Sequence, residues 1–179
     1  MNRPHKYRRT FHQFLKEQLG YKIPAPLIPR RLRIYGHVAV LWLKPQVLHH
    51  KEAIGLKVLE YDSRILSVLR RVDAISGPFR KPSLELIAGS SETETTLSEN
   101  GCTFHIDPMK VMFSLGNKAE RERMSLVGTG ELVVDMFAGI GQFTIPMAVH
   151  ASPRAIHAIE WNPEAFHYLE RNISENQVS

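Results

Sequence analysis

Residues 132–141 read Leu-Val-Val-Asp-Met-Phe-Ala-Gly-Ile-Gly, and residues 156–160 read Ile-His-Ala-Ile-Glu. The first stretch is an apolar strand that ends on an acidic residue and continues into a glycine turn. The second is a strand that also ends on an acidic residue. This order is typical of the first half of a nucleotide-binding α/β sheet. The two stretches therefore predict an α/β fold in which a Rossmann-like sheet begins here.

The spacing within these stretches discriminates among nucleotides. Asp135 stands four positions before Gly139, Gly141 follows, and Glu160 ends the second strand. A dinucleotide-binding turn needs a third glycine, so the pattern favours S-adenosylmethionine and leaves a dehydrogenase as a distant alternative. Two glycines alone would indicate only a structural turn. The acidic residues at both strand ends favour the cofactor.

The glycine turn has a chemical reason for each of its residues. Gly139 and Gly141 permit backbone angles and a close approach that a Cβ would block. The methionine part of the cofactor is then expected to lie against this turn, which also contains Phe137. Asp135 is placed to hold the ammonium group, directly or through water.

The end of the second strand is expected to bind the sugar. Glu160 offers two acceptor oxygens to two adjacent ribose hydroxyls; a solvated glutamate is the alternative. Trp161 follows it and is suited to pack on the adenine, although an interface or core aromatic is an equally good interpretation.

Composition bounds the class of protein. The chain has 179 residues, 43% of them apolar, which suits one globular domain or two small ones. No apolar run approaches the ~20 residues that span a bilayer, so we expect no membrane partner. The single cysteine, Cys102, cannot form an internal disulfide, which suits the cytoplasm. The nine histidines show no metal-ligand spacing, so no metal is expected.

The net charge of +5 favours a polyanionic partner, although many proteins are mildly basic. Four basic or histidine-bearing stretches are candidates for phosphate contacts, and solvated surface is the more frequent explanation for any one of them. They are Arg30–Arg33, His49–Lys51, Arg70–Arg71 and Arg80–Lys81.

Periodicity and turn residues divide the chain into three parts. Residues 1–30 are expected to form a helix that ends at Gly20, followed by a proline-containing linker. Residues 31–112 are expected to form a small α+β module on the substrate side. Its expected elements are strands at 34–43, 65–72 and 84–88, a helix at 47–61, and a hairpin of strands 93–97 and 102–106 around Asn100-Gly101.

Residues 113–179 are expected to form the N-terminal half of the cofactor-binding domain. Asn117 and Glu120 suggest a capping box, and Pro146 should distort the helix expected at 141–150. Asn162-Pro163 is a good start for the last helix, and strands are expected at 131–135 and 154–159.

Several stretches together resemble the archaeal and eukaryotic tRNA enzymes that modify guanosine beside the anticodon. The stretches are Phe113–Met124 (Phe-Ser-x-Gly-Asn-x-x-Glu-x-x-Arg-Met), Val134–Gly141, Ala158–Pro163, Ile75–Pro82 and Glu99–Gly101. One branch of this family is the guanine-37 N1-methyltransferase. The other is the wybutosine-pathway aminocarboxypropyltransferase, which moves the 3-amino-3-carboxypropyl group of S-adenosylmethionine onto the tricyclic base.

Two signs favour the aminocarboxypropyltransferase branch. Phe-Ser-x-Gly-Asn at 113–117 is similar to that branch, whereas the methyltransferases more often read Phe-Ser-Pro-Arg, and they commonly carry Asp at the position of Glu160. The resemblance implies transfer to the wybutosine precursor at guanine 37 of tRNA(Phe), with N1-methylation as the alternative. It places cofactor contacts on Ser114, Arg121 and Glu160, and a guanidinium at Arg121 would suit the cofactor carboxylate. No residue stands out as a catalytic general base.

Two parallel strands and two helices do not close a doubly wound sheet. We therefore expect a missing C-terminal segment or a further chain to complete it, and we expect the 179 residues alone to have little or no activity. The alternative interpretation is a protein of another functional class, namely a non-catalytic RNA-binding fragment or subunit.

Overall fold

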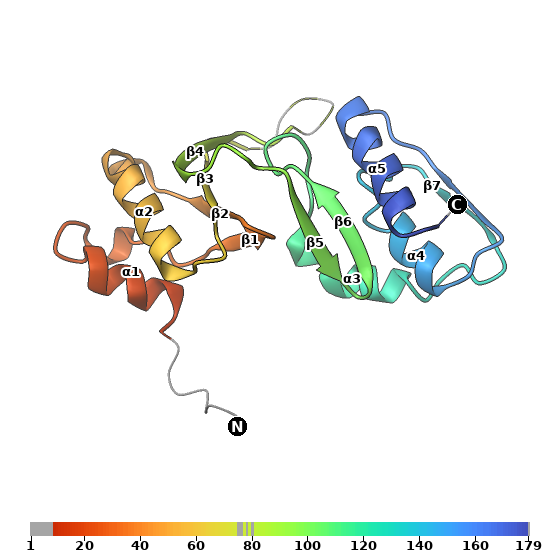
Figure 1. The fold of residues 1–179 in the computed structure, drawn as a ribbon, viewed down its shortest axis with the longest axis horizontal. Coiled ribbons are helices and arrows are strands. Elements are labelled where there is room, and N and C mark those ends of the chain that lie inside the picture. Colours follow the sequence, from red (N-terminus) through yellow and green to blue (C-terminus); the bar gives the residue numbers. More distant parts are fainter. Residues whose placement is uncertain (1–8, 75–76, 78, 80, 179) are drawn as a thin grey trace, which may run out of the picture. The chain divides into compact units, whose positions relative to one another are not determined.

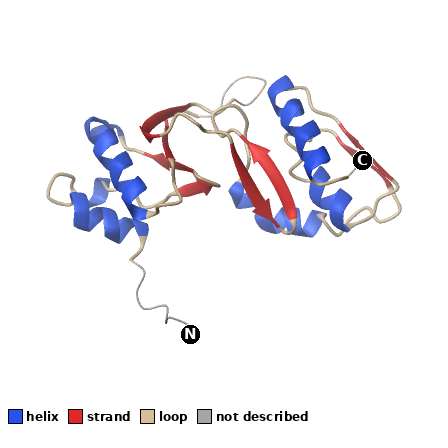
Figure 2. Cartoon of the chain, in the orientation of Figure 1, coloured by secondary structure: helices blue, strands red, loops and turns tan. Residues whose placement is uncertain are grey.

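The computed structural model describes residues 9–74, 77, 79 and 81–178. The chain divides into two compact units. The first spans Met1–Val72 and Leu84–Glu92, and the second spans Asp73–Ser83 and Thr93–Ser179. Both contain helices and strands (Figure 2). The expected boundary at residue 112 differs from this division, because the hairpin before it belongs to the second unit.

A four-stranded sheet forms the centre of the first unit, in the order β1-β2-β3-β4 (Figure 1). Its strands are β1 Arg33–Tyr35, β2 Val38–Trp42, β3 Ser67–Arg71 and β4 Leu84–Gly89. The β2–β3 pair is parallel and the other two pairs are antiparallel. The single strand expected at 34–43 is wrong: Gly36, with φ 51°, turns the chain and makes a hairpin of β1 and β2.

Helices cover the core of the first unit. They are α1 Phe11–Leu19, the 3₁₀ turns η1 Ala25–Leu27 and η2 Pro45–His50, and α2 Lys51–Tyr61. Thr10 accepts a bond from the Gln13 amide, and Gln13 reaches back to the Thr10 amide, so a capping box starts α1. Leu15, Ile54 and Val68 are fully buried in one apolar cluster. The expected linker contributes to it, since Ile23 and Ile28 are also buried.

The second unit begins with the expected hairpin. Strands β5 Thr95–Glu99 and β6 Cys102–Ile106 pair antiparallel, and Asn100 and Gly101 both have positive φ in the turn between them. The chain then forms η3 Leu115–Asn117, α3 Lys118–Met124, β7 Leu132–Asp135, α4 Thr144–His150, β8 Ala155–Ala158 and α5 Pro163–Glu175. Strands β7 and β8 are parallel, and α4 connects them. This is the predicted start of a Rossmann-like sheet.

One local expectation in this unit is wrong and another is confirmed. The Asn117 side chain makes no capping bond, and the Glu120 side chain accepts two bonds from Arg123 in place of the Asn117 amide. The helix expected at 141–150 begins only at Thr144, so Pro146 lies in the first turn of α4, where no N–H donor is needed. Asn162 does cap α5, where its side chain accepts from the Glu164 amide at 3.1 Å.

Candidate functional site

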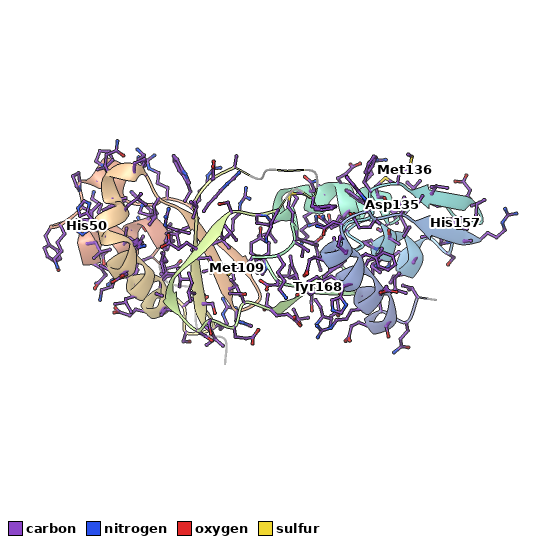
Figure 3. The ribbon with its side chains drawn as sticks, turned by 90° about the horizontal axis from the view of Figure 1, so that it is seen from above. His50, Met109, Asp135, Met136, His157 and Tyr168 are labelled. Carbon is purple, nitrogen blue, oxygen red and sulfur yellow. The ribbon has the colours of Figure 1, made fainter. Side chains whose placement is uncertain are left out.

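Asp135 ends β7 and is held by the start of the next helix. Its Oδ2 accepts from the Thr144 hydroxyl at 2.7 Å, and its Oδ1 accepts from the Phe137 amide at 3.3 Å. Figure 3 shows Asp135 beside Met136 at the end of this strand. Because Thr144 is buried, its bond to the Asp135 carboxylate fixes the orientation of that carboxylate at the start of the glycine turn.

Glu160 joins the second strand to the same turn. Its Oε2 accepts from the Gly139 amide at 2.7 Å, and its Oε1 accepts from the Asn162 amide at 2.7 Å. The structure therefore brings together the two strand ends that the sequence singled out. A carboxylate has about four acceptor positions, so these two bonds leave room for two further donors.

The glycine turn is packed on one side and open on the other. Gly141 has φ +91°, and a Cβ there would come within 2.7 Å of the Ile145 side chain and 3.1 Å of Leu169. At Gly139 an added Cβ would meet only the Gln142 amide nitrogen, at 3.6 Å. The backbone at Gly139 is thus accessible to a ligand, while Gly141 fixes the turn against α4 and α5.

Large apolar side chains surround the two carboxylates and remain exposed. Met136, Phe137 and Trp161 are exposed to 63%, 86% and 74%. The Phe79 ring lies 5.0 Å from the Trp161 ring, and Asn162 donates to the Phe79 carbonyl at 3.3 Å. Exposed apolar groups beside fixed polar groups are typical of a ligand site. Part of the 75–82 stretch, including Arg80, lies outside the described residues.

Ser114 and Arg121 lie in direct contact, but through the backbone of Ser114. Arg121 is 1% exposed and donates from Nη1 to the Ser114 carbonyl at 2.7 Å. Its Nε and Nη2 donate to the two carboxylate oxygens of Glu99 at 2.7 and 3.0 Å, and its guanidinium lies 4.4 Å from the Phe113 ring centroid. The expected contact of Arg121 with a cofactor carboxylate stays a prediction.

Sequence reasoning missed two residues that hold this arrangement. Gln142 accepts from the Ser114 amide at 3.1 Å and donates to the Met112 carbonyl at 3.3 Å, which ties Ser114 to the glycine turn. Glu99 neutralises Arg121. Their partners lie 22 to 30 positions away, so no local spacing reveals them. The only signal was that Gln142 directly follows the turn and that Glu99 precedes Asn100-Gly101.

An open apolar groove of about 720 Å³ lies along β8 and α5. Val134, Ile156, Ile159, Phe166 and Ile173 are among its lining residues. Within the part of the chain that the structure describes, β7 and β8 pair only with each other. Among these same residues, no group of three or more His, Cys, Asp or Glu could hold a metal ion, and no helix has the length and apolarity to cross a membrane.

Two family models match consecutive parts of the chain. Residues 15–93 match the TYW2 N-terminal domain, and residues 95–179 match the TRM5/TYW2 methyltransferase domain. The chain belongs to the TRM5/TYW2 family. The resemblance found in the sequence is thereby confirmed, and the junction between the two matches falls next to the unit boundary at Glu92–Thr93.

Two curated relatives carry the name of the aminocarboxypropyltransferase branch of the TRM5/TYW2 family. The tRNA(Phe) (4-demethylwyosine(37)-C(7)) aminocarboxypropyltransferase of Methanocaldococcus jannaschii is 46% identical over 63% of this chain and 45% of its own length. The enzyme of that name from Pyrococcus horikoshii is 40% identical over 92% of this chain and 59% of its own. This chain thus spans about half the length of these curated relatives.

Solved structures of the TRM5/TYW2 family confirm the fold. P. horikoshii TYW2 in complex with MeSAdo has a TM-score of 0.76 at 36% identity, covering 94% of this chain and 60% of that one. The complex of aTrm5 with tRNALeu has a TM-score of 0.82 at 32% identity, covering 94% of this chain and 50% of that one. The α/β fold with the start of a methyltransferase-type sheet is therefore established.

Proposed function

We propose that this chain is the N-terminal part of a cytoplasmic, S-adenosylmethionine-dependent tRNA transferase. The proposed reaction moves the 3-amino-3-carboxypropyl group to the wybutosine precursor at guanine 37 of tRNA(Phe). The observation that carries it is the bond from the Gly139 amide to the Glu160 carboxylate, which brings both acidic strand ends to one glycine turn. The names of the M. jannaschii and P. horikoshii relatives support this branch.

The residues at the turn fit S-adenosylmethionine in their chemistry. Glu160 would take the ribose hydroxyls, Asp135 the ammonium group, and Gly139 and Gly141 the methionine chain, with Phe137 and Trp161 beside the aromatic face of the adenine. Both carboxylates are already oriented by backbone or hydroxyl donors, so binding does not require them to reorganise. The bound cofactor supplies a sulfonium centre whose attached carbons are open to attack by a base nitrogen or carbon.

The contribution of the protein is to align one carbon of the sulfonium centre with the acceptor atom of the base. Methyl transfer leaves S-adenosylhomocysteine, and aminocarboxypropyl transfer leaves methylthioadenosine, so the outcome depends on which carbon faces the base. We assign this choice to the segment from Ser114 to Arg121, because Gln142 and Arg121 hold both backbone polar groups of Ser114 next to the turn. The guanine-37 N1-methyltransferase remains the alternative, since aTrm5 shares the fold.

The groove along β8 and α5 supports a further part of the proposal. Val134 and Ile159 are exposed to 55% and 53%, and the open edges of β7 and β8 suit additional strands. A longer C-terminal segment or a further chain would cover these apolar groups. This completion would also supply the remaining groups of the active site.

Two measurements test the proposed function. Calorimetry should detect S-adenosylmethionine binding to the chain, and Glu160→Gln should weaken it at least tenfold, because an amide cannot accept from Gly139, Asn162 and two hydroxyls together. Glu164→Gln, four residues further on α5, is the matched control and should bind as the unchanged chain does. An absence of cofactor binding with retained tRNA binding would favour the non-catalytic interpretation.

Analysis of the by-product with cognate tRNA then separates the two branches. It is carried out with the chain and whatever segment completes its sheet. Methylthioadenosine is expected. S-adenosylhomocysteine as the only by-product would reject the aminocarboxypropyltransferase in favour of the methyltransferase.

A further inference from the structure

The β5–β6 hairpin is fastened to α5 by two asparagine side chains. Asn176 accepts from the Thr103 amide at 2.8 Å and donates to the Thr103 carbonyl at 2.7 Å. Asn172, one helical turn earlier, does the same for His105 at 2.7 and 3.2 Å. The two carboxamides therefore satisfy alternate backbone groups of β6 as a neighbouring strand would.

Asn172 makes one more bond, to the glycine turn. Its Nδ2 donates to the Ile140 carbonyl at 2.9 Å, between Gly139 and Gly141. Both Asn172 and Ile140 are completely buried. Losing this donor would leave a buried carbonyl without its partner, which is costly. The position of the turn is thus linked directly to the position of the hairpin.

The other end of the hairpin holds Ser114. We call Ser114 and the glycine turn the two walls of the proposed cofactor site. Glu99 is the last residue of β5, and both of its oxygens accept from Arg121, which in turn donates to the Ser114 carbonyl. A bidentate pair fixes the plane of the guanidinium as well as its position. Because Arg121 is buried and Glu99 nearly so, this geometry is protected from solvent.

We propose that the β5–β6 hairpin is the positioning element of the cofactor site, with Glu99 and Asn172 as its positioning residues. Asn172 fixes the position of the glycine turn. Glu99, acting through Arg121, fixes the position of the Ser114 backbone. The hairpin then sets the separation between these two walls together with Gln142, which accepts directly from the Ser114 amide. The inference rests on the proposed function for its ligand, S-adenosylmethionine, and neither positioning residue needs to touch that ligand.

The test combines amide hydrogen exchange with cofactor binding in the whole chain. Glu99→Gln should speed exchange of the Ser114 amide at least tenfold and raise the Kd for S-adenosylmethionine at least fivefold, because the guanidinium loses its fixed plane. Glu99→Asp keeps the charge but is one methylene shorter, and it should restore folding stability while leaving Ser114 exchange faster than in the unchanged chain.

The matched control is Glu94→Gln. Glu94 precedes the same hairpin and bonds to Arg171 and Tyr168 on α5, so the substitution removes the charge of another glutamate that joins the hairpin region to α5, in a more exposed pair that does not involve Ser114 or the turn. It should lower the melting temperature without changing Ser114 exchange or the Kd. Asn172→Ser gives the second arm: it should speed exchange of the Gly139 and Gly141 amides and leave Ser114 less affected.

Two outcomes would overturn the inference. One is a Glu99→Gln or Glu99→Asp variant in which the melting temperature falls while Ser114 exchange and the Kd stay within twofold. The other is an Asn172→Ser variant whose glycine-turn amides exchange at the original rate. If the unchanged chain binds no cofactor, the proposed function fails, but the exchange measurements still decide whether the hairpin positions the two walls.

Discussion

Gly141 is the residue at which the backbone of the site has least freedom to change. Its φ of +91° disfavours any side chain, and a Cβ would lie 2.7 Å from Ile145. We expect Gly141→Ala to lower the free energy of unfolding by about 2–4 kcal/mol, from left-handed strain and overpacking together. Urea denaturation measures this loss.

Gly130→Ala is the control for backbone strain alone. Gly130 also has a positive φ, of +70°, but an added Cβ would meet nothing within 4 Å. Gly130→Ala should lower the free energy of unfolding by only about 1–2 kcal/mol. Equal losses for the two variants would show that packing against Ile145 contributes nothing.

Among the candidate site residues, the sequence predicted the proximity of those that are close together along the chain or end neighbouring strands. Asp135, Gly139, Gly141 and Glu160 stand at the ends of strands or in the turn between them, so their spacing places them together. Gln142 could not be found in the same way, because its function depends on a bond to Ser114, 28 positions earlier. Packing of segments distant in sequence decides such pairs.

Helix α5 depends on a buried phenol. Tyr168 is 1% exposed and donates to Glu94 at 3.1 Å, and burial together with the Glu94 carboxylate raises the pKa of Tyr168 above its usual 10.0. The unfolded chain then loses this proton at a lower pH than the folded one. The stabilisation is complete below pH ~10 and is lost as pH rises beyond it.

We therefore expect the free energy of unfolding to fall above pH ~10, with a smaller fall in Tyr168→Phe. Denaturant titrations between about pH 9 and 11.5 measure both slopes. Tyr35, whose pKa is also raised by burial, should account for part of the slope that remains in the variant. Identical slopes with and without the Tyr168 hydroxyl would contradict this assignment.

Elements with their own end signals were predicted well. Strand β6, helix α1 and the Asn162-Pro163 start of α5 agree with the sequence, because caps and turns mark their limits. Elements that lack such signals were not. Apolar and aromatic residues occur in both β1 and β2, and only the backbone at Gly36 shows that the chain reverses between them.

Charge is unevenly distributed over the whole chain. Met1–Val72 with Leu84–Glu92 carries 15 Lys and Arg against 6 Asp and Glu, a net +9, whereas the second unit carries 8 against 12, a net −4. The sequence showed the total of +5 but not this division, because the expected boundary at 112 joined the acidic hairpin to the basic part. A polyanion should therefore bind mainly to the first unit.

The partner in the proposed function, tRNA, should bind to the basic first unit through its phosphates. Affinity should fall at least tenfold between 50 and 200 mM KCl, because phosphate contacts release counterions. Arg31→Gln with Arg33→Gln, both exposed on the first unit, should weaken binding and reduce the slope of log K against log salt by up to ~1.8. Lys118→Gln with Arg154→Gln, both exposed on the second unit, is the charge-matched control and should leave the slope unchanged. Equal effects of the two pairs, measured by filter binding, would show that net charge acts without regard to its position.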